Sequence, residues 1–444
     1  RSSAASDVYK RQTLESAEER KEMLVSLCRN YDWALFKFDA VCGPLREEKE
    51  DLFVEMIGEC RKYSPDLILL NHRLGLKKAE QCATTFLWEG KESYIDVNSF
   101  NTCAAPHNRV GALGRGLVPD LKRLTEDHGV CLSSCLDYWE DELVLQAFNR
   151  SLLLSPQIYG NPWLLSDREF PKLARIFNLH RKFSGLLVDG IELPSAYGKY
   201  AVSRGDDKTR LITLRNLTWE PQKVKIVLNH EIGLEECKHV KCRLYHPVER
   251  ILGIYNYGES VEVTVLPFRS MLFYASADES LDGIGVEGTD FEIIKDVAGK
   301  PIEINLLGFA GTQSHIKLNN LPGVEKIEMD GQDVTKKLSN SKTMNINFEG
   351  GKYSKSYHRK IADLSPVSIP YDVNTLYEAT VFVADNNAME VRSLYRSGTT
   401  KIKQVEEARN AFFNQSAFIN RGVWDKYLFD GDMGTGSVSY THLT

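Results

Sequence analysis

Asp39 is the residue whose type and position most strongly suggest chemistry. It ends the run from Trp33 to Asp39, which is apolar apart from Lys37 and is followed by Cys42-Gly43-Pro44. Such a run predicts a strand buried on both faces, as in a parallel sheet, and the Gly-Pro pair predicts where it stops. In α/β barrels the carboxyl ends of the strands carry the catalytic groups, so Asp39 is a candidate nucleophile or acid/base. The alternative is that it caps the next helix.

Polar residues also follow the other apolar segments of this region. These side chains can exchange hydrogen bonds or protons, and they are Asn71, His72, Arg73, Glu89, Glu92, His107 and Asp137. Glu89 comes directly after Trp88 and Glu92 follows three residues later, where the alternative is a solvated charged loop. Histidines and aspartates in loops are more often simple surface groups, which is the alternative for His107 and Asp137.

Helical and strand patterns alternate through this part of the chain. The expected helices occupy residues 13–29, 47–63 and 143–154, with another ending near 182. The expected strands occupy 33–39, 67–73, 84–88 and 129–134, with a last short strand and turn within 155–162. This order, with polar residues at each strand end, predicts a parallel α/β arrangement. Roughly five strand–helix units are present, which corresponds to the later part of an eight-unit barrel.

At this point the residues resemble the retaining α-galactosidase and α-N-acetylgalactosaminidase clan of glycoside hydrolases (families 27 and 36). The similarity rests on Lys37-Phe38-Asp39, on Trp88 followed by carboxylates, and on a helix that runs into Ser155-Pro156 before Tyr159-Gly160-Asn161. It covers residues 32–183 and the β-rich part that follows. The resemblance implies the C-terminal part of a (β/α)8 TIM barrel, without its first strands, followed by antiparallel β-sandwich domains.

The resemblance also implies an activity and roles for single residues. The protein is expected to be a retaining exo-α-glycosidase acting on α-linked galactose or a related sugar, with Asp39 as nucleophile and Lys37 as a ligand of sugar hydroxyls. The clan uses an aspartate after its tryptophan as acid/base, whereas this chain has Glu92 and Glu89. Glu92 is favoured because its offset from Trp88 fits the clan, and Glu89 is second.

The remaining candidates would bind an oligosaccharide or polysaccharide substrate. Asn71, His72, Arg73, His107 and Asp137 could contact hydroxyls, and Trp88 and Trp139 could stack on sugar rings or, alternatively, pack in the core. No cofactor is expected for catalysis. A non-catalytic glycan-binding protein derived from the same fold is the alternative function.

Beyond residue 183 the pattern changes to short alternating strands. These are expected at 200–203, 209–217, 223–228, 242–245 and 260–274, and they predict an antiparallel β-sandwich over 185–277. A small all-β domain is expected over 284–351, with a hairpin turn at Asp330-Gly331. Asn216-Leu217-Thr218 matches a glycosylation sequon.

The last part of the chain, 375–437, resembles the beginning of a discoidin-like carbohydrate-binding domain. Such domains hold a structural calcium through oxygen ligands, and Asp430 and Asp432 would suit that ion. The alternative is an Asp-Gly turn in a loop. Residues 1–12 and 438–444 resemble the translation of a sequencing adaptor, and we expect them to form no part of the fold.

Composition excludes several classes of function. A net charge of -6 without charged blocks argues against a nucleic-acid partner, and no apolar run in the 444 residues reaches the length of a membrane span. The 9 cysteines lack zinc-ligand spacing, so no metal site is expected from them, although Cys237 and Cys242 could form a bridge in an oxidising compartment. The family resemblance implies a periplasmic or extracellular location.

Overall fold

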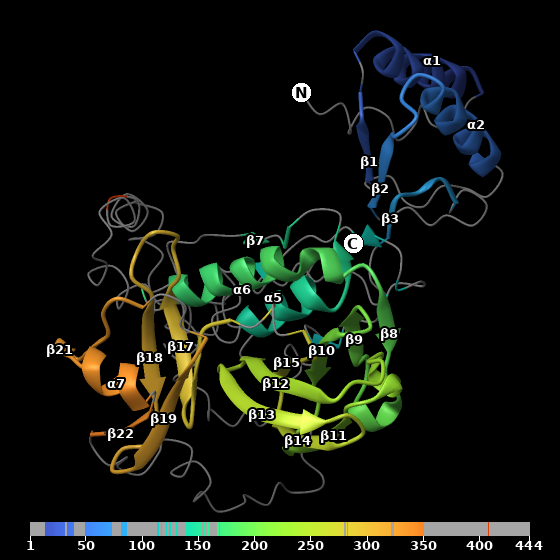
Figure 1. Cartoon of the computed structure of the whole chain (residues 1–444). Coiled ribbons are helices and arrows are strands. Elements are labelled where there is room, and N and C mark those ends of the chain that lie inside the picture. Colours follow the sequence, from blue (N-terminus) through green and yellow to red (C-terminus); the bar gives the residue numbers. More distant parts are fainter. Residues whose placement is uncertain are drawn as a thin grey trace, which may run out of the picture.

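The computed structural model describes residues 14–31, 33–39, 49–72, 81–86, 139–152, 169–278, 283–320, 324–341 and 343–349, with short pieces between 113 and 167 and single residues at 281 and 407. They form a mixed α/β structure in which most strands belong to antiparallel sheets (Figure 1). Parallel strands occur in the first part of the chain, but within the described ranges they do not close into a barrel. No described helix combines the length and the apolar character needed to span a bilayer.

The first part of the chain consists of two helices and a pair of parallel strands. In chain order these are α1 (Leu14–Tyr31), β1 (Leu35–Asp39), α2 (Glu50–Arg61) and β2 (Ile68–His72). The strands pair in parallel with Asp39 opposite His72. On α2, Phe53, Ile57 and Cys60 recur at helical spacing and form its buried stripe. The helices and strands predicted for this region are confirmed.

β1 is covered on one face only. Phe36 is 6% exposed and packs among residues of α1 and α2, whereas Leu35 is 40% exposed and Trp33 is 44% exposed. Lys37 is exposed as well. The prediction that this strand is buried on both faces is therefore wrong for the described part of the chain, which supplies helices to one face and no covering to the other.

Short parallel strands and two further helices follow. They are β3 (Thr85–Phe86), β4 (Leu124–Thr125), β5 (Val130–Cys131), α5 (Trp139–Phe148), β6 (Ser151–Leu152), β7 (Ile158–Tyr159) and α6 (Glu169–Phe183). β4 lies between β3 and β6, and β5 pairs with β7. The helix predicted at 143–154 begins earlier, at Trp139, and ends at Phe148. Just beyond the helix, Asn149 accepts a hydrogen bond from the Thr213 hydroxyl at 2.9 Å, and the chain enters β6 at Ser151.

An antiparallel β-sandwich comes after α6. Its strands are β8 (Gly190–Glu192), β9 (Val202–Gly205), β10 (Thr209–Arg215), β11 (Gln222–Val227), β12 (His239–His246), β13 (Arg250–Asn256), β14 (Ser260–Val265) and β15 (Ser270–Ser276). One sheet has the order β13-β12-β15-β10-β9-β8, and β11 pairs with β14. The strands predicted here are confirmed, except that the segment 260–274 forms two strands separated by a turn.

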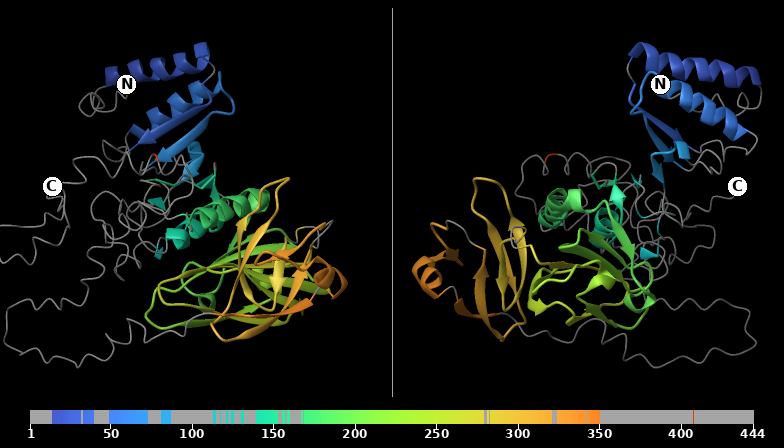
Figure 2. Two further views of the ribbon diagram at one scale, coloured as in Figure 1. Left: turned by 90° about the vertical axis from the view of Figure 1, so that its left-hand side faces the viewer. Right: turned by 45° about the vertical axis from the view of Figure 1, so that its right-hand side comes forward.

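The six-stranded sheet lies between two other layers (Figure 2). On one face, Ile212 and Phe273 join the core shared with β11 and β14. On the other face, Leu211 and Leu272 pack against α5 and α6. Because side chains alternate along a strand, this double covering buries every residue of β10 and β15.

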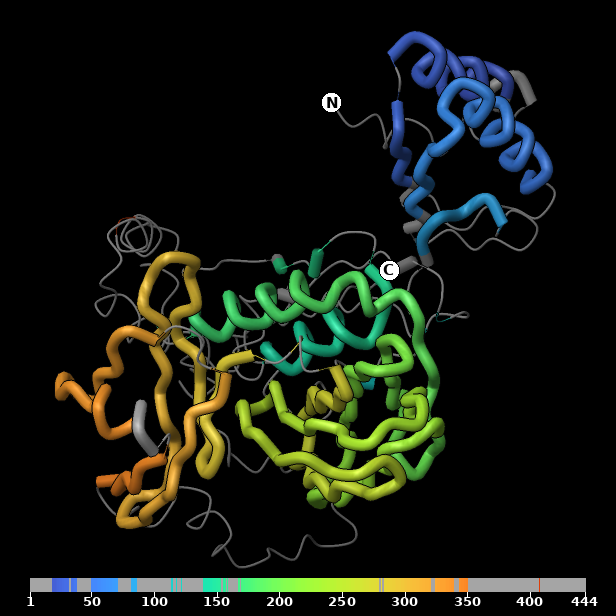
Figure 3. Tube along the Cα trace, viewed as in Figure 1, coloured from blue at the N-terminus to red at the C-terminus, as the bar shows by residue number. Residues whose placement is uncertain are grey.

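A smaller group of strands follows beside α6 (Figure 3). It contains β16 (Gly285–Glu287), β17 (Asp290–Lys295), β18 (Glu303–Leu307), β19 (Gln313–Asn319), β20 (Glu328–Met329), β21 (Gln332–Asp333), α7 (Thr335–Ser341) and β22 (Thr343–Asn347). β20 and β21 form the predicted hairpin. Asp330 and Gly331 both have positive φ, 49° and 79°, as a type I′ turn requires.

The structure decides two open points in the sandwich. Cys237 and Cys242 are both free thiols, so the possible bridge does not form, and burial raises the pKa of the Cys242 thiol. Asn216 of the sequon is 0% exposed, and its amide donates to the carbonyl oxygens of Glu220 and Val265 at 2.7 and 3.0 Å. The folded protein therefore does not offer this amide for glycosylation.

Candidate active site

The strand ends predicted to carry the catalytic groups lie next to each other. β1 and β2 run in register, so the backbones of Asp39 and His72 lie opposite each other where the pair ends. The chain returns beside β2 at Thr84, whose N–H donates to the Leu69 carbonyl oxygen at 2.9 Å and whose hydroxyl accepts from the Leu69 N–H at 3.0 Å. β3 begins at the next residue. β2 therefore lies between β1 and the segment that leads to Trp88.

The structure gives different amounts of information for the predicted site residues. Lys37 lies on β1 with its side chain exposed, two residues before Asp39. For Asp39, Asn71 and His72 the backbone positions on β1 and β2 are described. Outside the described residues lie Arg73, Trp88, Glu89, Glu92, His107 and Asp137, as do Asp430 and Asp432 of the expected calcium site. Their predicted roles remain predictions.

Trp139 lies in the hydrophobic core. It is 1% exposed, it packs among side chains of α5, α6 and the sandwich, and its indole N–H donates to Glu169 at 3.0 Å. A ring enclosed in this way cannot stack on a sugar. The alternative role given for Trp139, packing in the core, is the one that the structure supports.

Asp141, two residues further on α5, holds a buried group of polar side chains against the sandwich. Its carboxylate accepts from Arg269 at 2.7 Å and from the Ser270 hydroxyl at 3.3 Å, and it hydrogen-bonds with His246 Nε2. Asp141 is 0% exposed and His246 is 1% exposed. This cluster joins the helices to the six-stranded sheet, and its burial keeps substrate away from it.

His246 is the titratable partner of Asp141 in this cluster. Burial lowers the pKa of His246 to about 4, although Asp141 opposes that shift. Its Nδ1 atom has no hydrogen-bond partner in the described part of the chain, so a proton there would be buried without an acceptor. No local sequence pattern indicates this pair, because the two residues are 105 positions apart.

Glu249 forms a second buried charged cluster. Its carboxylate accepts from Arg175 at 2.7 and 3.1 Å and from Arg243, and its side chain is 3% exposed. Burial alone would raise the pKa of Glu249, but the two guanidinium groups hold it below its usual value. Arg243 also donates to the Ile284 carbonyl oxygen at 3.0 Å. The cluster therefore ties α6, β12 and the segment before β16 together.

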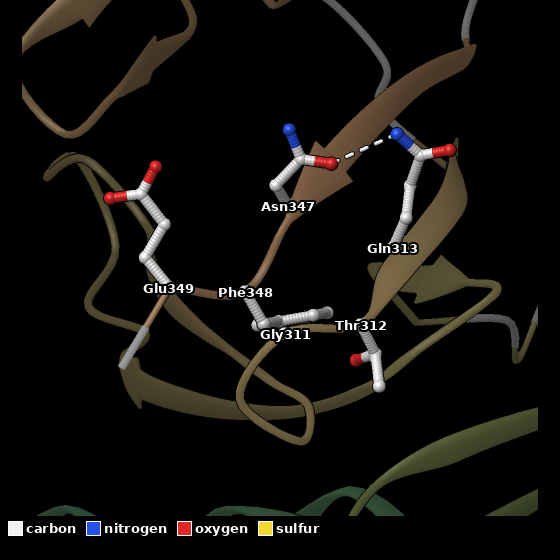
Figure 4. A pocket seen from close by; sticks show the side chains of 6 residues that line it. All are labelled: Gly311, Thr312, Gln313, Asn347, Phe348 and Glu349. Atoms are coloured by element: carbon white, nitrogen blue, oxygen red, sulfur yellow. Dashed lines mark hydrogen bonds between the residues drawn. The ribbon is translucent and has the colours of Figure 1, made fainter. Parts of the chain in front are cut away.

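The smaller group of strands carries an open pocket of about 380 Å³ (Figure 4). It is lined by Gly311, Thr312, Gln313, Asn347, Phe348 and Glu349. The amide of Gln313 donates to Asn347 across β19 and β22 at 2.9 Å. Among the described residues of the lining, Glu349 is the only carboxylate, so they do not supply the second carboxyl group that retaining hydrolysis requires. The described residues contain no group of side chains that could hold a metal ion.

Comparison with known proteins finds neither a family model nor a curated protein that matches this chain. Among solved structures, α-galactosidase I from Mortierella vinacea is 12% identical with a TM-score of 0.38, covering 59% of this chain and 72% of that chain. The α-galactosidase from Saccharomyces cerevisiae is 10% identical with a TM-score of 0.36, and the match covers 59% of this chain and 76% of that chain. An α-amylase from Geobacillus thermoleovorans is 11% identical with a TM-score of 0.34, and the match covers 60% of this chain and 64% of that chain.

These three solved structures are glycoside hydrolases. The matched region spans 64% of the amylase chain.

Proposed function

We propose that this protein is a retaining exo-α-glycoside hydrolase of the α-galactosidase type, acting on α-linked galactose or a related sugar. The fold proposed for it is the later part of a (β/α)8 barrel over 13–183, followed by the sandwich, the small β domain and a discoidin-like domain over 375–437. The observation that carries the proposal is the spatial order of β1, β2 and β3. It separates Asp39 by one strand from the segment that leads to Glu89 and Glu92.

That separation suits a retaining pair of carboxyl groups. Neighbouring strands of a sheet lie about 4.8 Å apart, so backbones on either side of β2 are about 10 Å apart. Retaining glycosidases hold their two carboxyl groups about 5 to 5.5 Å apart. An aspartate and a glutamate at parallel strand ends can close that difference with their own side chains.

The proposed reaction assigns one step to each carboxylate. Asp39 attacks the anomeric carbon and forms a glycosyl–enzyme ester, while Glu92 gives its proton to the leaving oxygen. Glu92 then takes a proton from water, which attacks the same carbon and releases Asp39. Lys37, close to Asp39 in sequence, favours the ionised carboxylate and can hydrogen-bond a sugar hydroxyl.

The decisive experiment is Asp39→Ala with an activated aryl α-galactoside. We expect turnover to fall by about three orders of magnitude or more, because the covalent step is lost. Added azide should restore turnover as an external nucleophile. Lys37→Met is the matched comparison, since it removes a ligand but leaves the nucleophile. If the turnover of Asp39→Ala stayed within about tenfold of the parent's, the assignment of Asp39 as nucleophile would be overturned.

The proton donor can be identified from the dependence on the leaving group. Glu92→Gln should nearly abolish cleavage of a natural disaccharide and spare an activated aryl glycoside, whose leaving group needs no proton. Glu89→Gln should not discriminate between these two substrates. The reverse pattern would transfer the role to Glu89. Lack of discrimination in both variants, together with intact sugar binding, would favour the non-catalytic glycan-binding alternative.

A further inference from the structure

Trp219 is an aromatic ring held out from the sandwich surface. It is 72% exposed, and Phe268 meets it edge to face, with ring centroids 4.9 Å apart and an interplanar angle of 87°. Trp219 lies in the connection from β10 to β11 and Phe268 in the turn from β14 to β15. One face-exposed ring is therefore braced by a second ring from a distant part of the sequence.

Asn216 locks the connection that carries Trp219. Its side-chain oxygen accepts from the Thr218 N–H at 2.8 Å and from the Thr218 hydroxyl at 2.7 Å, and its amide donates to the Glu220 carbonyl oxygen at 2.7 Å. The same amide reaches the Val265 carbonyl oxygen at 3.0 Å, at the end of β14. Both turns are thus fixed to each other, and Trp219 is held before any ligand arrives.

Phe268 occupies a backbone position that favours glycine. The Arg269 N–H donates to the Leu266 carbonyl oxygen at 3.2 Å and closes a turn with Pro267 second and Phe268 third. Phe268 has φ of 53°, as the third residue of a type II turn requires, and a bulky side chain is strained there. A strained residue that braces an exposed ring indicates a functional constraint rather than optimisation of stability.

The surroundings of Trp219 fit a sugar ring better than a protein partner. Beside the ring in sequence, Glu220 is exposed, and no described residue forms a hydrogen bond or ion pair with its carboxylate. The Thr218 hydroxyl lies on the other side. Leu266, 50% exposed, is the neighbouring apolar residue of the facing turn. One indole face with a single apolar neighbour and flanking polar groups matches a pyranose ring, which offers one apolar face edged by hydroxyls.

We propose that Trp219, braced by Phe268, is a secondary binding site that stacks on the apolar face of a neutral pyranose in a polysaccharide. The inference rests on the proposed function for the nature of the ligand. The indole face contacts the ring carbons, and the carboxylate of Glu220 accepts from the hydroxyls. Its role is to hold a long substrate on the protein, so short substrates do not depend on it.

The test measures binding of the full chain to a soluble galactomannan by affinity electrophoresis, with dextran as the comparison polysaccharide. Trp219→Ala should weaken retention by the galactomannan at least tenfold. Phe268→Gly should weaken it several-fold while Tm stays equal or rises, because glycine relieves the strained turn. Asn347→Ala, in the pocket of Figure 4, is the matched control and should bind as the parent does. Loss of binding with unchanged or raised Tm separates a binding role from a structural one.

Three outcomes would overturn the inference. They are retention unchanged in Trp219→Ala, loss of retention in Asn347→Ala instead, and a change of oligomeric state in Trp219→Ala, which would mean that a second copy covers the ring. The same gels with Asp39→Ala keep the two proposals apart. Asp39→Ala should bind the galactomannan as the parent does while it loses turnover, whereas a parent that lacks hydrolytic activity but still depends on Trp219 for retention would refute the proposed function and leave the binding site standing.

Discussion

Two strands of this protein show burial opposite to what their compositions suggest. β1, Leu35–Asp39, is largely apolar, yet Leu35 is 40% exposed and Lys37 is exposed. β10, Thr209–Arg215, begins and ends with polar residues and contains two arginines, yet every residue in it is buried. The difference lies in the neighbours. The described helices cover one face of β1, whereas β10 is covered by helices on one face and by β11 and β14 on the other.

Burial of arginines in β10 is tolerated because backbone carbonyl oxygens surround them. Arg210 donates to Gly205 at 2.6 Å and to Ser203 at 2.8 Å, and Arg215 donates to Leu113 at 2.7 Å. Burial nevertheless lowers the pKa of Arg210. The burial of a strand is therefore decided by the layers that pack on it, and buried charges are acceptable where acceptors are already in place.

The largest effect that would test this comparison is expected at Glu249. Glu249→Ala leaves Arg175 and Arg243 buried without their carboxylate, and we expect it to lower the free energy of unfolding by about 3 to 5 kcal/mol. Urea unfolding followed by circular dichroism measures the change. Asp290→Ala is the control, because its partner Arg250 is 54% exposed. This substitution should lower the free energy of unfolding by about 1 kcal/mol or less. Equal costs for both would show that the Glu249 cluster is hydrated.

The sequence predicted those parts of the fold that depend on local patterns. Alternation identified β10 and β11, helical spacing identified α2, and Asp330-Gly331 identified a hairpin. Contacts between distant residues left no such pattern. Glu249 and its partner Arg175 are 74 positions apart, so neither their pairing nor their burial could be read locally.

For the candidate site, the sequence predicted which strands end in polar residues but not how their side chains are placed. The pairing of Asp39 with His72 follows from two apolar runs joined by an amphipathic helix. Trp139 was ambiguous, because a tryptophan beside carboxylates is found both in cores and in sugar sites. Its burial is decided by α6 and the sandwich, which pack on it from later parts of the chain.

A second test of the comparison uses pH. The folded pKa values of His246 and His180 are both lowered to about 4 from 6.5 by burial, with Asp141 opposing the shift at His246. The unfolded chain therefore binds these protons first, so stability is complete above pH 6.5 and is lost as pH falls toward 4. For His246 the loss should reach about 3 kcal/mol. Urea midpoints between pH 8 and 4 measure it.

His246→Gln separates the contribution of this residue. Its amide can still donate to Asp141 but does not titrate, so the loss of stability below pH 6.5 should shrink relative to the parent. An exposed histidine such as His315 provides the matched control, and His315→Gln should leave the pH profile unchanged. A profile that is as steep in His246→Gln as in the parent would show that other groups control acid unfolding.

The smallest effect is expected on the uncovered face of β1. Leu35→Thr exchanges an exposed leucine for a residue that also suits a strand. We expect it to lower the free energy of unfolding by about 0.5 kcal/mol or less. The same exchange at Leu214 of β10, which is 0% exposed, should cost about 3 kcal/mol because it leaves a cavity and buries a hydroxyl.

Because these strands belong to different parts of the protein, one global unfolding curve would not separate them. Hydrogen exchange measured by mass spectrometry on peptides from each strand reports the local opening free energy instead. If Leu35→Thr lowered the local opening free energy by more than about 2 kcal/mol, another part of the protein would have to cover this face. In that case β1 would be buried as its composition predicts, and its difference from β10 would disappear.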